Sequence, residues 1–199
     1  MVEIVLLSGG IDSVTLLYLK QRDGTQLHAL FADYGQRAAA EERRAAQYHA
    51  DLLDVPLTRL DLAQVGETFR AGQTQRLHVP LPHRNLVALA LGLSYAAQIG
   101  AQRIHLALNR DDVTAYPSAS QLFLERFNTM ARSLGEFVVE TPLLALDKTE
   151  VIQQALALKI DLNKTYSCLL GYPKACGHCP QCVHRGAALL AAGLPKEGK

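Results

Sequence analysis

Two hydrophobic patterns alternate along the chain. Short runs that are continuously apolar or alternate between apolar and polar residues predict strands at residues 3–7, 28–32, 57–62, 103–108 and 137–140. Segments with helical spacing or strong helix formers predict helices at residues 12–21, 38–53, 85–99, 118–134 and 147–158. Strands that alternate with helices are typical of an α/β fold, so we expect a mostly parallel, doubly wound sheet with helices on both faces.

Two stretches lack a clear period. Residues 63–82 contain two glycines and two prolines and are predicted to form a long loop or flap. The chain from residue 161 onward is predicted to be irregular and contains all four cysteines. We therefore expect an α/β domain at residues 1–160 and a tail at residues 161–199 that packs on the same domain.

Composition supports one ordinary globular domain and gives no sign of a polyelectrolyte. The chain has 199 residues, of which 49% are hydrophobic and 20% charged, and its net charge is +1. This balance does not favour a nucleic-acid binder that depends on phosphate contacts. The start lacks a basic region, and no apolar run is long enough to span a bilayer, so we expect a cytoplasmic protein without a membrane partner.

A glycine-rich loop joins the first predicted strand to the first predicted helix. Helix N-termini carry unpaired N–H groups and favour anions, and adjacent glycines let N–H groups surround phosphate oxygens. Asp12 could cap the helix or help hold Mg²⁺ on the phosphates. A plain strand–turn–helix connection explains the local pattern as well, whereas a Walker A loop and a dinucleotide fingerprint are excluded. The candidate nucleotide-binding residues are Leu7, Ser8, Gly9, Gly10, Ile11, Asp12 and Ser13.

The cysteines form one cluster, with seven, two and two residues between Cys168, Cys176, Cys179 and Cys182. This spacing predicts a structural Zn²⁺ site with four thiolate ligands. Disulfides do not suit a chain without a secretion signal, and a redox C-x-x-C leaves two cysteines unexplained. An iron–sulfur cluster remains the rival, because C-x-x-C-x-x-C also occurs in ferredoxins.

The segment Ser8-Gly9-Gly10-Ile11-Asp12-Ser13 resembles the S-G-G-x-D-S signature of PP-loop, or N-type, ATP pyrophosphatases. Together with the cysteine cluster, it resembles the 7-cyano-7-deazaguanine synthase family of queuosine biosynthesis. Further similar segments lie at residues 31–36, 82–85, 109–112, 116–117 and 142–148. The chain departs from the family pattern at His83, where glycine is usual, and at residues 118–120, where an acidic residue, a cysteine and an arginine are usual.

This resemblance implies an adenine-nucleotide α-hydrolase-like fold with a zinc-bound tail, often assembled as a homodimer. It implies an ATP-dependent carbon–nitrogen ligase that converts 7-carboxy-7-deazaguanine and ammonia to the nitrile through an adenylate. The implied cofactors are ATP, Mg²⁺ and one Zn²⁺. The implied catalytic residues are Asp12, Lys148 and Arg84, and the implied substrate-binding residues are Tyr34, Gln36, Arg84, Asn85 and Asp112.

Local chemistry bears on several of these residues. Lys148 lies in a first helical turn, where a cation is unfavourable unless it faces an anion such as phosphate. Asn85 could be only a helix cap, and Arg84 beside it suits an anion. The charged run at residues 41–44 is predicted to be a solvated helix face. Two other functions stay open: another PP-loop adenylating enzyme, such as a tRNA sulfurtransferase, and a non-catalytic zinc-binding interaction module.

Overall fold

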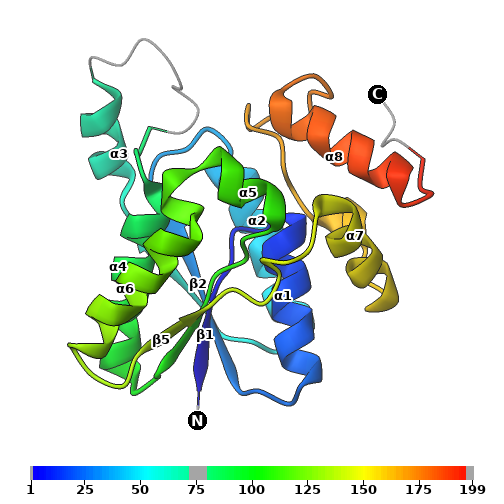
Figure 1. Ribbon diagram of the computed structural model, residues 1–199. Helices are drawn as coiled ribbons and strands as arrows, with labels where there is room; N and C mark the ends of the chain where they lie inside the picture. The colour runs from blue at the N-terminus through cyan, green and yellow to red at the C-terminus, as the bar shows by residue number, and fades with distance from the viewer. Residues whose placement is uncertain (1, 72–79, 196–199) are drawn as a thin grey trace.

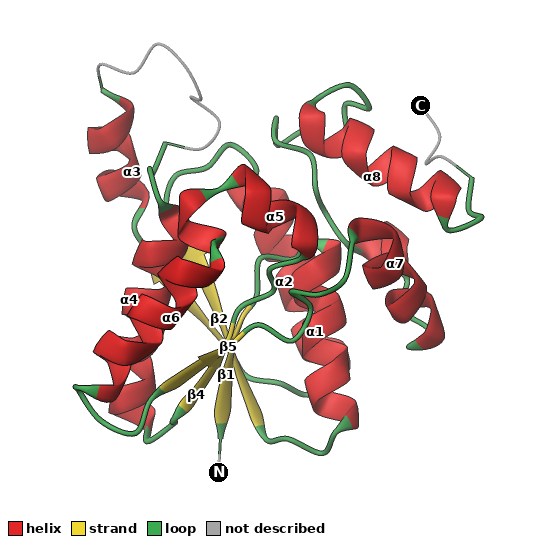
Figure 2. Ribbon diagram, in the orientation of Figure 1, coloured by secondary structure: helices red, strands yellow, loops and turns green. Residues whose placement is uncertain are grey.

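The sheet is fully parallel and has five strands in the order β3-β2-β1-β4-β5. The computed structural model describes residues 2–71 and 80–195. Figure 2 shows the strands fanning out between two groups of helices. The strands are β1 (Glu3–Leu6), β2 (Leu27–Asp33), β3 (Leu57–Asp61), β4 (Arg103–His105) and β5 (Val138–Glu140). The chain builds one half of the sheet outward from β1 and then returns to build the other half, so the doubly wound expectation is confirmed.

Helices cover both faces of the sheet (Figure 1). On one face, α1 (Ile11–Arg22), α2 (Ala39–Leu52) and α7 (Lys148–Ala157) enclose a core with Val5, Leu16 and Ile152. On the other, α4 (Arg84–Ile99) and α6 (Gln121–Arg132) enclose a core with Ile4, Leu89 and Phe127. The two clusters of buried side chains pack against opposite faces of the sheet and hold it as a rigid platform.

The predicted flap is partly wrong, because residues 63–70 form helix α3 (Ala63–Arg70). Gly66 weakened the helical signal in the sequence. In the structure a Cβ at Gly66 would lie 1.8 Å from the carbonyl oxygen of Tyr34, so glycine lets α3 pack directly on the turn after β2. Residues 72–79 of the predicted flap lie outside the described residues.

The predicted tail is also more regular than expected, because it contains α8 (Pro180–Ala191). Proline suits the first turn of a helix, where its missing N–H has no intrahelical partner. Leu162, Ala188 and Leu189 lie in the same core as α1 and α7. The division of the chain at residue 160 stays a prediction, although these residues pack on the α/β domain as expected.

Three short helical elements complete the described part of the chain. α5 (Arg110–Ala115) begins with a capping box between Asn109 and Asp112, and two 3₁₀ turns lie at Pro117–Ala119 and Leu162–Lys164. None of the helices described here is both long and apolar enough to cross a membrane.

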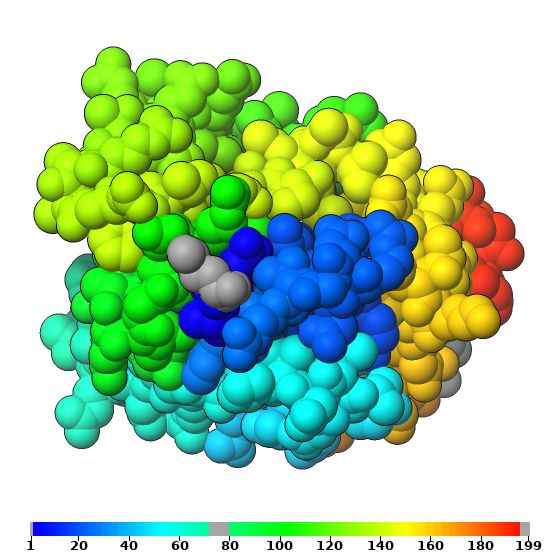
Figure 3. Space-filling view, turned by 90° about the horizontal axis from the view of Figure 1, so that it is seen from below, coloured from blue at the N-terminus to red at the C-terminus, as the bar shows by residue number. Residues whose placement is uncertain are grey.

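The two ends of the sheet differ in what surrounds them. The amino-terminal ends of the strands face the viewer in Figure 3, where the start of the chain lies at the centre of the molecule. The carboxyl ends lie on the opposite side, toward α5 and α8 in Figure 1. In open α/β sheets, ligands bind at the carboxyl ends, at the point where the strand order reverses. Here that point is between β1 and β4.

Candidate active site at the carboxyl end of the sheet

The glycine-rich loop after β1 lies at this reversal point and is held in shape by its own serines. Ser8 N–H donates to Ser13 Oγ over 3.1 Å, and the two hydroxyl oxygens are 3.0 Å apart. Ser13 Oγ also lies 3.1 Å from the carbonyl oxygen of Gly10, to which it donates. These contacts set the loop conformation before any ligand is bound.

The two glycines of the loop differ in how much space the fold leaves for a side chain. Gly9 has φ +77°, and a Cβ there would lie 2.3 Å from the carbonyl oxygen of Glu42, so the packing of α2 on the loop requires glycine. Gly10 has φ −76°, and its Cβ would meet only ordinary contacts, at 3.5 Å from Ser8 and 3.6 Å from Tyr166. The fold therefore leaves room for a Cβ at Gly10 and does not itself require glycine there.

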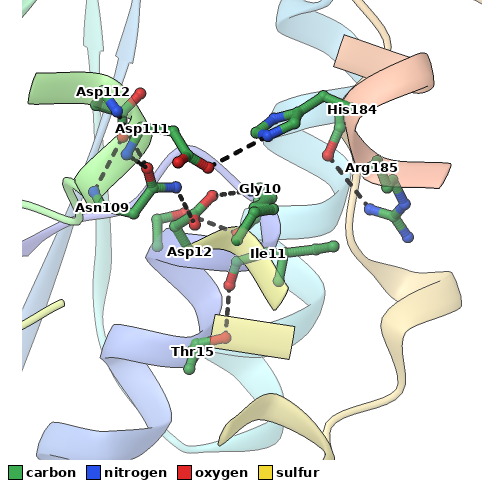
Figure 4. A network of polar contacts seen from close by, with 12 residues as sticks. Gly10, Ile11, Asp12, Thr15, Asn109, Asp111, Asp112, His184 and Arg185 are labelled. Carbon is green, nitrogen blue, oxygen red and sulfur yellow. Dashed lines mark hydrogen bonds and ion pairs between the residues drawn. The ribbon is translucent and has the colours of Figure 1, made fainter. Parts of the chain in front are cut away.

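Asp12 and Lys148, both predicted to be catalytic, form an ion pair although 136 positions separate them. Asn109 Nδ2 donates to the other carboxylate oxygen of Asp12 over 3.0 Å (Figure 4). Burial acts to raise the pKa of Asp12, but Lys148 and Asn109 outweigh it and hold the pKa below its usual range. A charged carboxylate and an ammonium therefore stand together where the N-termini of α1 and α7 meet.

The ion pair explains why the protein tolerates a buried cation in the first turn of α7. Lys148 is only 8% exposed, and the positive end of the helix dipole disfavours it there. Asp12 compensates both costs. α7 begins with a capping box, in which Asp147 accepts from Glu150 N–H and Glu150 accepts from Asp147 N–H.

Asn109 was not among the predicted site residues. Its side-chain oxygen caps α5, and its amide nitrogen contacts Asp12, so it ties the loop after β4 to the loop after β1. The feature of the sequence that could have identified Asn109 is its position directly after a predicted strand, at the point where the strand order reverses.

Arg84, at the start of α4, lies over the ring of Tyr116, with its guanidinium carbon 5.1 Å from the ring centroid. Burial acts to lower the pKa of Arg84, but Tyr34, Tyr116 and Glu42 hold it above its usual range. Burial raises the pKa of Tyr34. Arg84 is therefore a fixed positive charge with a stacked aromatic partner.

Asn85 and His83 flank this arginine. Asn85 Nδ2 donates to the carbonyl oxygen of Ser118 over 3.3 Å, which ties α4 to the 3₁₀ turn at Pro117–Ala119. His83 has φ +48° and ψ +40°, a left-handed conformation that favours glycine. The histidine is therefore in a strained position at the entrance to α4.

Gln36 and Asp112 are engaged by the protein itself. Gln36 is buried, accepts from Tyr34 N–H over 2.9 Å and donates to Glu42 Oε2 over 2.9 Å. Asp112 Oδ2 accepts from the N–H of Asn109 over 3.0 Å, as part of the capping box. Burial raises the pKa of Asp112.

The prediction of a solvated face at residues 41–44 is wrong for its first two members. Glu41 is 9% exposed and pairs with Arg44, and Glu42 is half-buried beside the glycine-rich loop. The sequence run is charged, but the loop after β1 packs against this side of α2.

The four cysteines come together as predicted, with all four sulfur atoms within 4.8 Å of one another. Cys176 Sγ and Cys182 Sγ are 3.9 Å apart. Backbone N–H groups point at two sulfurs, Cys176 N–H at Cys168 Sγ over 3.4 Å and Cys179 N–H at Cys176 Sγ over 3.3 Å. Such N–H donors favour thiolates, and thiolates are what a metal ion requires.

The tail that carries the cysteines also contacts the glycine-rich loop. Tyr166 N–H donates to the carbonyl oxygen of Gly9 over 2.9 Å. Buried Arg185 of α8 holds the same segment through Thr165 Oγ1 at 2.8 Å and the carbonyl oxygen of Leu162 at 2.7 Å. His184 lies 3.2 Å from Asp111 of α5, as Figure 4 shows. The tail therefore supports the site as well as the cysteine cluster.

Comparison with known proteins gives matches over nearly the whole chain. A family model described as "Queuosine biosynthesis protein QueC" matches residues 2–193. The 7-cyano-7-deazaguanine synthase of Thiobacillus denitrificans is 36% identical, over 96% of this chain and 94% of that protein.

Solved structures share the fold at low sequence identity. The NMN synthetase of Francisella tularensis is 17% identical, with a TM-score of 0.59 over 98% of this chain and 78% of that one. The U34-tRNA thiolase NcsA of Methanococcus maripaludis, solved with its [4Fe-4S] cluster, is 17% identical, with a TM-score of 0.58 over 94% of this chain and 63% of that one.

Proposed function

The chain belongs to the queuosine biosynthesis protein QueC family, and from that premise we propose that it converts 7-carboxy-7-deazaguanine and ammonia to 7-cyano-7-deazaguanine at the expense of ATP. Its relatives carry the name of that synthase. The observation that carries the proposal is the meeting of Asp12, Lys148 and Asn109 beside the glycine-rich loop. This arrangement combines anion-binding N–H groups, a cation and a carboxylate at the ligand-binding end of the sheet.

The chemistry requires two activations. A carboxylate oxygen is a poor leaving group, so it attacks the α-phosphate of ATP, releases pyrophosphate and forms an acyl adenylate. Ammonia then displaces AMP and gives the amide. The amide oxygen attacks the α-phosphate of a second ATP and again releases pyrophosphate, and loss of AMP with two protons leaves the nitrile. Holding both reactants in one site contributes up to about 7–11 kcal/mol toward each barrier.

The charged residues of the site suit the negative charges of the phosphates and of the substrate carboxylate. We assign Lys148 and the N–H groups of residues 9–12 to the phosphates, where they stabilise the departing pyrophosphate. Asp12 offers the carboxylate oxygens that suit Mg²⁺, and that ion, when bound, would neutralise phosphate charge. Arg84 is our candidate for the substrate carboxylate, because its guanidinium can bind it through two hydrogen bonds.

The other residues that the sequence predicts to bind the substrate come from three segments of the chain. Tyr34 and Gln36 follow β2, Asn85 follows Arg84 on α4, and Asp112 lies on α5. Tyr34 is close enough for its charge state to affect Arg84. We propose that these side chains line the substrate site, with Gln36 mainly positioning Glu42.

We propose that the cysteine cluster holds one structural Zn²⁺. Thiolates about 2.3 Å from a tetrahedral zinc lie about 3.8 Å from one another, and Cys176 and Cys182 are 3.9 Å apart. A four-iron cluster separates its thiolates by the width of the cluster, which is more than this site provides. The site therefore favours a single ion, although the NcsA structure contains a cluster on the same fold.

Small-molecule chemistry of this kind suits a cytoplasmic enzyme, and the net charge of +1 does not favour an RNA-binding protein. As part of the same function, we propose that the protein is cytoplasmic, that it does not act on RNA, and that it assembles as a homodimer.

The decisive experiment is mass spectrometry of the products formed from 7-carboxy-7-deazaguanine, ammonium and ATP. The proposal requires the nitrile together with AMP. Thiolation of tRNA instead would identify a sulfurtransferase, and failure to bind ATP in isothermal titration would identify a non-catalytic module.

A further inference from the structure

Glu42, a residue outside the predicted site, lies beside the glycine-rich loop. It belongs to the first turn of α2, and its backbone carbonyl is the atom that a Cβ at Gly9 would strike. Its carboxylate receives a hydrogen bond from Gln36 Nε2 over 2.9 Å. The residue is half-buried, and this hydrogen bond fixes its carboxylate in place.

The surroundings of Glu42 come from three elements. Arg84 of α4 attracts its negative charge, whereas Asp33 at the end of β2 opposes it. The negative charge of Glu42 also acts to raise the pKa of Tyr34, which lies in the turn after β2. Burial raises the pKa of Glu42, and the Gln36 hydrogen bond and Arg84 only partly offset this. Glu42 therefore lies among the residues that we assign to the substrate.

The other carboxylates near these residues are already engaged. Asp112 accepts from the backbone of Asn109. Asp33 Oδ2 accepts from Arg59 over 2.7 Å, and Asp33 Oδ1 from the N–H of Gly35 over 3.2 Å. Within the described residues, the carboxylate of Glu42 has the Gln36 hydrogen bond and no ion pair. An ionised carboxylate has about four acceptor positions, so Glu42 keeps most of its capacity for a ligand.

Given the proposed function, we propose that Glu42 determines specificity by accepting hydrogen bonds from the donor edge of the deazaguanine ring. This edge presents a ring N–H and an exocyclic amine side by side, which two carboxylate oxygens can bind together. Arg84 would then hold the carboxylate at the other end of the same molecule. A site that pairs buried polar groups with substrate donors can reject an analogue lacking one by up to about 10⁴-fold.

The test compares kcat/KM for 7-carboxy-7-deazaguanine with kcat/KM for the analogue that lacks the 2-amino group. Glu42→Gln keeps a carbonyl oxygen for Gln36 but replaces an acceptor with a donor. We expect this variant to lose at least about tenfold of the wild-type preference, a change of about 1.4 kcal/mol, while ATP affinity from isothermal titration is unchanged. A preference equal to that of the wild type would overturn the proposal.

Two further variants control the comparison. Glu41→Gln removes the neighbouring carboxylate of the same helix turn, which pairs with Arg44 instead, and should leave the preference unchanged. Glu42→Asp keeps the charge on a shorter side chain and should retain more of the preference than Glu42→Gln. Equal losses in Glu41→Gln and Glu42→Gln, or no rescue by aspartate, would overturn the proposal.

The same data separate this inference from the proposed function. If the wild-type protein forms no nitrile at all, the proposed function is wrong and the role of Glu42 falls with it. If the wild type forms the nitrile and Asp112→Asn, rather than Glu42→Gln, removes the preference, the function stands and only the assignment of Glu42 is wrong.

Discussion

Adding one methyl group to Gly9 or to Gly10 should have opposite consequences, although the residues are adjacent. At Gly9 an alanine would hold φ +77° at a cost of about 1–2 kcal/mol. Its Cβ would lie 2.3 Å from Glu42 O and 2.9 Å from Ala46 N, both backbone atoms of α2. Overpacking of this kind costs about 1–3 kcal/mol. We therefore expect Gly9→Ala to lower the free energy of unfolding by about 2–5 kcal/mol.

At Gly10 the backbone is already in a conformation that alanine adopts, and the Cβ would have ordinary contacts. Gly→Ala at such a position stabilises a protein by about 0.4–1 kcal/mol, because it restricts the unfolded chain. The methyl group would lie where we place the phosphates. We expect Gly10→Ala to fold at least as well as the wild type and to bind ATP at least about tenfold more weakly, which is about 1.4 kcal/mol.

The assay is urea unfolding of both variants in the same excess of zinc, followed by isothermal titration with ATP and Mg²⁺. Gly9→Ala should unfold at lower urea, and Gly10→Ala should unfold at the same or higher urea than the wild type but bind ATP at least about tenfold more weakly. Tight ATP binding by Gly10→Ala would show that the loop is only a connection between strand and helix. A fully stable Gly9→Ala would refute the packing argument for α2.

Three further outcomes can be checked. Because the folded pKa of Asp12 lies below its unfolded value of about 3.9, its contribution to stability should be complete above about pH 5 and lost as the pH falls through the folded pKa. The unfolding free energies of wild type and Asp12→Asn should therefore differ at pH 7 and converge as the pH falls through the folded pKa of Asp12, whereas a pH-independent difference would contradict the ion pair with Lys148. His83→Gly should raise the melting temperature by about 2–4 °C, since relief of the left-handed backbone contributes about 1 kcal/mol; an unchanged or lower value would show that the histidine is not strained. Purified protein should be colourless with about one zinc per chain, and Cys179→Ser or a chelator should lower its melting temperature, whereas bound iron with visible absorbance would overturn the zinc assignment.

The sequence by itself determined the features that depend on neighbouring residues. Alternating apolar runs predicted all five strands and the helices that cover the sheet, because burial of one face requires a regular spacing. The Asp147–Glu150 capping box of α7 and the cysteine cluster were also predictable, since their partners lie within one turn or one short segment. The glycine-rich loop was placed correctly between β1 and α1 for the same reason.

Only the tertiary structure decided what depends on distant partners. The compensation of Lys148 by Asp12, the contact of Asn109 with Asp12, and the burial of Glu42 each join segments that are far apart along the chain. Gly66 lowers the local helix propensity, yet α3 can approach the backbone of Tyr34 closely only because this residue is glycine. Helix propensity and hydrophobic pattern depend on residues that are close in sequence. Desolvation, ion pairing and close backbone contacts depend instead on the residues that the fold brings close in space.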